Sequence, residues 1–181
     1  MSRVTDIFGE SHVLFVCEGT CEQVVITKLV ESGKLVIPSD CVLDISRTRK
    51  ASSIQDEYLK YDYEWPVAIA RIIDSRGERF ELGNLYRDRY PVVNFITHPE
   101  IEMLAIVREG KFDEYTRTRK SSFKPSDYCK TVLGMRQIKS EKFLEGYWDA
   151  EALVKSIRDY ARLTKRGPHE KLLVDLLRAD A

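Results

Sequence analysis

Residues 13–22 read VLFVCEGTCE, an apolar run that ends in Glu18, a glycine and, three residues later, a second carboxylate, Glu22. Apolar residues then recur at helical spacing. The pattern predicts a buried strand that turns directly into a helix over 21–32, with Glu18 at the carboxyl end of the strand. In open α/β sheets, ligands and metals bind at this edge.

Three later segments repeat the strand-like pattern, and helical patterns lie between them. The strongest is 66–74, PVAIARIID, which is nearly all apolar and ends in Asp74, so it should be a central strand covered on both faces. The alternation predicts an α/β fold with a mainly parallel central sheet of about four strands, flanked by helices and followed by C-terminal helices. The predicted strands are 13–17, 41–45, 66–74 and 91–97. The predicted helices are 21–32, 52–61, 99–108, 125–133, 150–162 and 168–178.

A length of 181 residues suits one domain, and 43% hydrophobic residues can build a sizeable core. We expect residues 1–110 to form the α/β core. Residues 111–181 differ in character, because a basic stretch leads into helices that would pack on the core or on a partner.

The formal net charge of zero hides an uneven distribution. Residues 1–64 carry 11 acidic and 7 basic side chains, a net of −4, whereas residues 117–142 carry 2 acidic and 8 basic ones, a net of +6. This asymmetry suits a metal site beside a surface for a polyanion, and a solvated helix and loop would carry the same charges. Tyr115, Phe123 and Tyr128 are interleaved, and aromatic rings can stack on unpaired bases. The residues expected to contact nucleic acid are Arg117, Arg119, Lys120, Lys124 and Lys130.

Acidic residues end or follow the predicted strands. Glu18 ends the first strand, Asp74 ends the strongest one, and Glu100 and Glu102 open the helix after 91–97. Because parallel strands bring their carboxyl ends to one edge of the sheet, these carboxylates should converge there. Hard oxygen ligands suit Mg²⁺ or Mn²⁺, which can activate water for phosphodiester cleavage.

The same acids also fit a purely structural interpretation, as helix-start and turn residues. Glu22 lies one helical turn from Glu18, so it could face the same edge. It could also be a simple acid of the first helical turn, which the helix dipole stabilises. His98 follows a strand and precedes Pro99. It would act as a general base or a phosphate contact, or it is a structural loop residue.

Several classes of protein are disfavoured. The chain has no apolar run of 18 residues, so no membrane span is expected, and its N-terminus lacks a signal-peptide pattern. The four cysteines are expected to be reduced thiols in a cytoplasmic protein rather than zinc ligands. The dinucleotide-binding, P-loop and GxSxG motifs are absent.

The order of these motifs resembles the Toprim catalytic fold, and most closely the small Toprim-related proteins of bacterial and phage-defence loci. That group includes the overcoming-lysogenization-defect (OLD) nucleases and their stand-alone relatives. The matching stretches are FVCEGTCE at 15–22, IID at 72–74 and HPEIEML at 98–104, within a resemblance that covers residues 12–107. It implies a metal-dependent nuclease of a defence system, with nucleic acid as substrate, a protein partner such as an ATPase subunit and an oligomeric state. Glu18, Asp74 and Glu22 would be catalytic, and the metal ligands would come from Glu18, Asp74, Glu100 and Glu102.

One position departs from the family pattern. The second acid of the family's DxD motif falls on Arg76, whose positive charge would repel Mg²⁺ at close range. Another carboxylate would then substitute, with Glu78, Glu81, Glu100 and Glu102 in reach by sequence, or the site is degenerate. A degenerate Toprim-like subunit would bind a nucleic acid, a nucleotide or a protein partner without cutting. Arg76 and His98 are therefore expected to modulate the site.

Overall fold

The computed structural model describes residues 4–75, 77–119 and 123–181 of the chain. Within these residues one sheet contains five strands, and every neighbouring pair is parallel. The strand order is β2-β1-β3-β4-β5. The strands are β1 (His12–Cys17), β2 (Val42–Ser46), β3 (Val67–Ile73), β4 (Val92–Ile96) and β5 (Lys171–Leu172).

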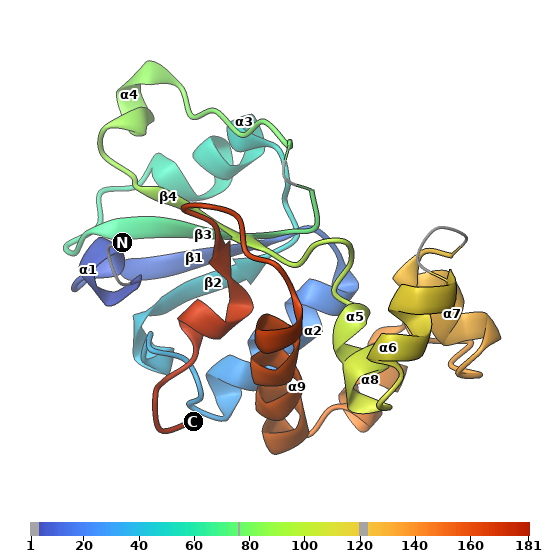
Figure 1. Ribbon diagram of the computed structural model, residues 1–181. Coiled ribbons are helices and arrows are strands. Elements are labelled where there is room, and N and C mark those ends of the chain that lie inside the picture. The colour runs from blue at the N-terminus through green and yellow to red at the C-terminus, as the bar shows by residue number, and fades with distance from the viewer. Residues whose placement is uncertain (1–3, 76, 120–122) are drawn as a thin grey trace.

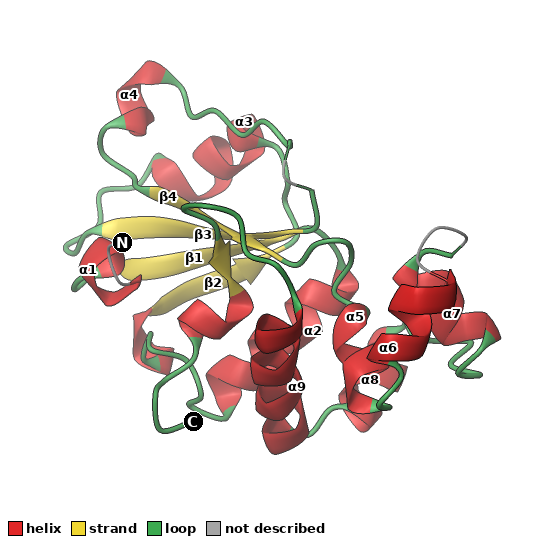
Figure 2. Ribbon diagram, viewed as in Figure 1, coloured by secondary structure: helices red, strands yellow, loops and turns green. Residues whose placement is uncertain are grey.

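Helices cover both faces of this sheet, as Figures 1 and 2 show. The α3 and α4 helices lie on one face, whereas α2, α5 and α9 lie on the other. The α helices are α1 (Val4–Phe8), α2 (Thr20–Glu31), α3 (Ala51–Ile54), α4 (Asn84–Arg87), α5 (Met103–Arg108), α6 (Phe112–Glu114), α7 (Pro125–Thr131), α8 (Glu141–Tyr147) and α9 (Ala150–Leu163). The η1 (Ser39–Cys41) and η4 (Leu173–Leu176) segments are 3₁₀ helices, and η2 (Gln55–Leu59) and η3 (Tyr115–Arg119) are π helices.

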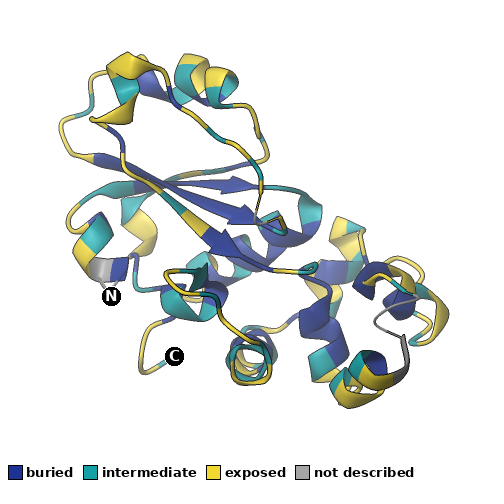
Figure 3. Cartoon of the chain, turned by 45° about the horizontal axis from the view of Figure 1, so that its top comes forward, coloured by how far each residue is buried: buried dark blue, intermediate teal, exposed yellow. Residues whose placement is uncertain are grey.

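The central strands are buried because both of their faces are covered (Figure 3). Along β1, Phe15 joins the core beneath α2, α5 and α9, whereas Leu14 and Val16 join the smaller core beneath α3. Such two-sided burial is typical of parallel strands and explains their continuous apolar sequence. Arg71 is a charged residue in the middle of β3, yet it is only 1% exposed.

The strand order creates a crevice at the carboxyl ends of β1 and β3. From β1 the chain crosses to β2 on one side, and from β3 it continues to β4 on the other side. In doubly wound sheets with this order, ligands bind where the direction of winding reverses. The loops after β1 and β3, which begin at Glu18 and Asp74, lie at that point.

Two expectations about this sheet are wrong. The sheet has five strands rather than about four, and the helix expected over 168–178 is absent, since the fifth strand and η4 occupy that segment. Leu172 pairs with Ile96, and the carboxylate of Asp175 accepts the Leu172 N–H at 2.7 Å as the chain leaves the strand. The leucine spacing was misleading because a 3₁₀ turn also places residues three apart on one side.

Residues 111–181 are joined to residues 1–110 through the sheet and the core. They contribute β5, and α9 packs against α5. Leu153 and Ile157 of α9 belong to the same hydrophobic core as Phe15 of β1. The C-terminal helices therefore pack on the α/β core. No helix in the described ranges combines the length and the apolar character that crossing a bilayer requires.

Candidate functional site

Glu18 and Asp74 lie beside each other at the carboxyl edge of the sheet. The backbone N–H of Glu18 donates to the carbonyl of Ile72, which extends the pairing of β1 with β3 by one residue. The backbone N–H of Asp74 donates to Glu18 Oε2 at 2.8 Å. The prediction that both acids lie at the same edge is confirmed.

A cavity of about 250 Å³ opens at this edge. The five carboxylates expected to be catalytic residues or metal ligands line it, and they come from the segments after β1, β3 and β4. Glu78 and Glu81, the other two carboxylates expected within reach, are not among the lining residues. Lys139, from the loop between α7 and α8, is the basic residue among its described lining. The lining residues are Glu18, Gly19, Thr20, Cys21, Glu22, Asp74, Glu100, Glu102 and Lys139.

Glu22 is the most buried catalytic candidate, with 7% of the residue exposed. Burial, together with the nearby charges of Glu102, Glu18 and Asp74, raises the pKa of its carboxyl to about 7, and a hydrogen bond from the Glu22 backbone partly opposes this rise. A Cβ atom at Gly19 would lie 3.3 Å from Glu22 Oε2, so glycine leaves room for the carboxylate. Glu22 therefore lies inside the acidic cavity and can hold a proton near neutral pH.

Glu102 also lines the cavity and is buried, with 6% of the residue exposed. Its Oε1 accepts a weak hydrogen bond from Cys21 Sγ at 3.7 Å and lies 3.5 Å from Lys139 Nζ. Lys139 was predicted to belong to the basic segment, but not to reach this cavity. Its ammonium partly balances the cluster of carboxylates.

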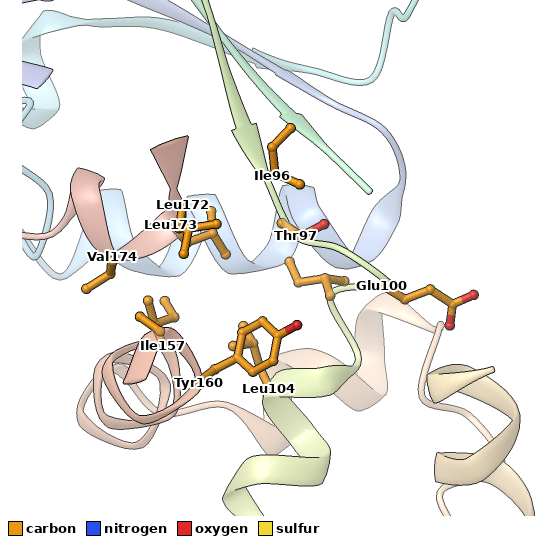
Figure 4. Close-up of a pocket in the computed structure, with 11 residues that line it drawn as sticks. Ile96, Thr97, Glu100, Leu104, Ile157, Tyr160, Leu172, Leu173 and Val174 are labelled. Carbon is orange, nitrogen blue, oxygen red and sulfur yellow. The ribbon is translucent and has the colours of Figure 1, made fainter. Parts of the chain in front are cut away.

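Glu100 contacts the N-terminal end of α7. Its Oε2 accepts the backbone N–H of Ser126, in the first turn of α7, at 2.8 Å. Figure 4 shows the carboxylate pointing away from Tyr160 and Leu173. A carboxylate at a helix N-terminus is stabilised by the unpaired N–H groups and the helix dipole. Glu100 therefore attaches α7 to the edge of the cavity.

A second void lies behind Glu100, between β4, β5, α5 and α9 (Figure 4). Its volume of about 20 Å³ leaves room for roughly one water molecule. Apolar side chains such as Leu104, Ile157 and Leu172 form most of its wall. This void is too small for a nucleotide and is a gap in the core packing.

Two arginines that were not predicted from the sequence lie next to the acidic cavity. Arg49, in the loop after β2, pairs with Glu18 at 2.6 Å and with Glu78 at 3.3 Å. Arg71 of β3 pairs with Glu78 at 2.8 Å. A sequence signal for Arg49 was present, because the basic run Arg47-Thr48-Arg49-Lys50 directly follows a predicted strand. That strand ends at the same edge of the sheet, so basic side chains could be expected there.

The donor chemistry of the cavity suits a hard cation. Its carboxylate oxygens are what Mg²⁺ and Mn²⁺ prefer, and Mg²⁺ is often held by one or two carboxylates together with water. A metal ion would need at least three His, Cys, Asp or Glu side chains grouped around it. In the described part of the chain, the side chains in their present conformations form no such group. One reason is visible at Glu18, whose two oxygens already face Arg49 and the Asp74 N–H. A directly bound ion would displace Arg49.

The basic segment is less continuous than its sequence indicated. Arg117 is 79% exposed on η3 and lies 3.9 Å from Asp113, Lys124 is exposed at the start of α7, and Lys130 is half-buried. Lys120 lies outside the described residues, and Arg119 ends η3.

The expectation that the interleaved aromatic residues stack on bases is wrong for two of them. Tyr115 and Tyr128 are 2% and 0% exposed, and their rings pack against each other with centroids 5.2 Å apart. The Tyr115 hydroxyl donates to the carbonyl of Phe123. These two rings attach η3 to α7 rather than face solvent.

His98 is not among the residues that line the cavity. Arg76 lies outside the described residues. His98 is exposed after β4, and its carbonyl accepts from the Tyr160 hydroxyl. All four cysteines are free thiols, as expected, and burial raises the pKa of Cys129 to about 12.

Comparison with protein-family models, with curated proteins and with solved structures found no match to this chain. The Toprim resemblance therefore remains an expectation carried by a few short motifs. Any function must be inferred from the acidic cavity, its flanking arginines and its position at the edge of the sheet.

Proposed function

We propose that this chain is a Toprim-like phosphodiesterase that uses Mg²⁺ or Mn²⁺ to cut nucleic acid. One observation carries the proposal: Glu18, Asp74 and Glu22 converge in a cavity at the point where the winding of a parallel sheet reverses. Clustered carboxylates are costly unless a cation balances them, and the charges of Glu102, Glu18 and Asp74 add to the rise in the pKa of Glu22 that burial mainly causes. A defence role and an ATPase partner follow from the family resemblance alone.

Each residue of the cavity would have a different role in the proposed reaction. Glu18 and Asp74 would hold the ion from the ends of adjacent strands. A bound divalent ion supplies Lewis-acid polarisation of a phosphate oxygen and lowers the pKa of its water. Glu22 has a pKa of about 7 without a metal. A bound cation would favour its charged form, which could then accept and return a proton at neutral pH. Lys139 keeps positive charge beside Glu102.

Calorimetry with Mn²⁺, combined with cleavage assays, tests this function. We expect the purified chain to bind Mn²⁺ and to cut at least one of single-stranded DNA, double-stranded DNA and RNA. EDTA should stop cleavage, and Mn²⁺ added in excess should restore it. Absence of Mn²⁺ binding in chelator-free buffer would contradict the proposal.

A catalytically silent Toprim-like subunit is the second candidate, and the Arg49–Glu18 ion pair favours it. A guanidinium 2.6 Å from Glu18 neutralises the charge that a cation would need. If this alternative holds, the chain should bind nucleic acid, a nucleotide or a protein partner with the same affinity in EDTA and in Mn²⁺. An affinity that depends on the metal would argue against it.

Arg117, which is exposed on η3, and the neighbouring basic residues Arg119 and Lys120 should contribute to nucleic-acid binding through phosphate contacts. Each contact to a single strand contributes about −0.7 to the slope of log affinity against log salt. Replacing Arg117, Arg119 and Lys120 by alanine should therefore flatten the slope by roughly 2 for an oligothymidylate. Alanine at Lys60, Arg87 and Arg89, on the α3–α4 side of the sheet, is the matched control. Equal slopes for the two triple variants would show that the 117–120 segment makes no contact.

A further inference from the structure

Glu78 is held between two arginines that come from different parts of the fold. Its Oε2 is 2.8 Å from Arg71 Nη2, and its Oε1 is 3.3 Å from Arg49 Nη2. Arg71 comes from the middle of β3 and Arg49 from the loop after β2. Each carboxylate oxygen faces a different guanidinium, which is an arrangement that also suits the oxygens of a phosphate.

Arg71 is difficult to explain by stability alone. Its side chain is 2% exposed in a strand whose other residues are apolar, and an apolar residue of similar volume is often neutral or better at such a site. Its Nη1 donates to Asn94 at 3.3 Å and its guanidinium stacks 4.3 Å from the Phe80 ring centroid. Its Nε has no acceptor among the described residues. The guanidinium is thus held rigidly but not fully satisfied.

The same arginine pair adjoins the acidic cavity. Arg49 Nη2 lies 2.6 Å from Glu18 Oε1, so the guanidinium that holds Glu78 also touches the first candidate metal ligand. An oxyanion placed between Arg49 and Arg71 would lie next to Glu18. This is where a phosphate must lie if a cation at Glu18 is to act on it.

We propose that Arg49 and Arg71 form a phosphate-binding subsite in which the Glu78 carboxylate stands in for the phosphate. The choice of phosphate rests on the proposed function, whereas the subsite itself rests on the two guanidiniums. A phosphate enters by displacing Glu78, which is 22% exposed and can turn outward. The phosphate belongs to a nucleic-acid chain or is free in solution.

Removing Glu78 should open the subsite. In EDTA, we expect Glu78→Ala to bind inorganic phosphate at least about tenfold more tightly than the wild type, because the competing carboxylate is gone. Phosphate should also raise the melting temperature of Glu78→Ala more than that of the wild type, at matched ionic strength. Glu81→Ala, an exposed change of the same charge in the same loop, is the control. Equal phosphate affinities for Glu78→Ala and Glu81→Ala would overturn the proposal.

Two further measurements complete the test. Adding Arg49→Met to Glu78→Ala should abolish the gain in phosphate affinity. If the double variant keeps that gain, the role of Arg49 is overturned. If Glu78→Ala does not fold, Glu78→Gln against Glu81→Gln answers the same question, since glutamine keeps an acceptor for Arg71.

The source of the phosphate is identified by comparing inorganic phosphate with a thymidine dinucleotide that carries only an internal phosphate. If Glu78→Ala binds both ligands more tightly than the wild type does, the subsite accepts a phosphate within a nucleic-acid chain. If it binds only inorganic phosphate more tightly, the subsite is specific for free phosphate. Because these titrations contain no metal and measure no cleavage, failure of the nuclease proposal leaves their result intact. Likewise, a failed phosphate titration does not alter the Mn²⁺ result.

Discussion

Glu18→Gln is expected to reduce Mn²⁺-dependent cleavage by at least about 100-fold and to weaken Mn²⁺ binding measurably. Loss of an anionic ligand removes several kcal/mol of charge stabilisation, and each 1.36 kcal/mol is a factor of about ten in rate. The amide oxygen can still accept the Asp74 N–H, which lies 2.8 Å from Glu18 Oε2. Arg49 retains Glu78 as an ionic partner. The variant should therefore fold, and its defect should be specific to the metal.

Asp74→Asn should reproduce this defect, because Asp74 lies at the end of the neighbouring strand and lines the same cavity. The control is Glu31→Gln, which makes the same chemical change at the exposed end of α2. Cleavage rates and Mn²⁺ isotherms for the three variants decide the matter. Full activity in Glu18→Gln or Asp74→Asn would exclude that residue as an essential ligand.

The acids of this cavity could be predicted because each is tied to a strand end by only a few residues. A parallel sheet brings such ends together regardless of how its helices pack, so Glu18 and Asp74 needed only correct strand assignments. Glu22 follows from helical spacing. The sequence predicted the correct sheet edge for Glu100 but not its hydrogen bond with Ser126, because these two residues are 26 positions apart in the chain.

The arginine network was only partly predictable in this way, because Arg49 follows a strand end whereas the Arg71–Glu78 pair does not. Arg71 reads as an interruption in an apolar strand, and its partner Glu78 lies in an irregular segment with no periodic pattern. The pairing depends on the position of a loop rather than on a strand end. The β5 strand was missed for a related reason, because only two residues pair and their partners on β4 lie more than 70 residues earlier.

The burial of Glu22 predicts a pH dependence of folding stability. In the folded chain its pKa is about 7, against an ordinary value of 4.5. Between these two pH values the unfolded chain releases the proton and the folded chain keeps it. Folding stability therefore falls as pH rises from 4.5 to 7, and the loss is complete above pH 7. At 1.36 kcal/mol per pH unit, the total loss is about 3 kcal/mol.

Glu22→Gln should remove most of this loss, because the amide carries no charge at any of these pH values. Denaturant unfolding in EDTA at pH 5, 6, 7 and 8 should give a stability difference, variant minus wild type, that grows with pH by about 2–3 kcal/mol. Any constant cost of burying an amide cancels in that trend. Glu31→Gln should show a difference that does not change with pH. If the free energy of unfolding changes with pH in the same way for Glu22→Gln and the wild type, then ionising Glu22 in the folded chain costs no stability.

The same measurement with Mn²⁺ links stability to the proposed site. A cation among Glu18, Asp74 and Glu22 favours the charged form of the carboxyl, so it should lower the pKa of Glu22. At pH 8 the wild type should then recover stability that it lacks in EDTA, and Glu22→Gln should recover less. An equal gain in both proteins would place the ion away from Glu22, and no gain in either would favour the silent subunit.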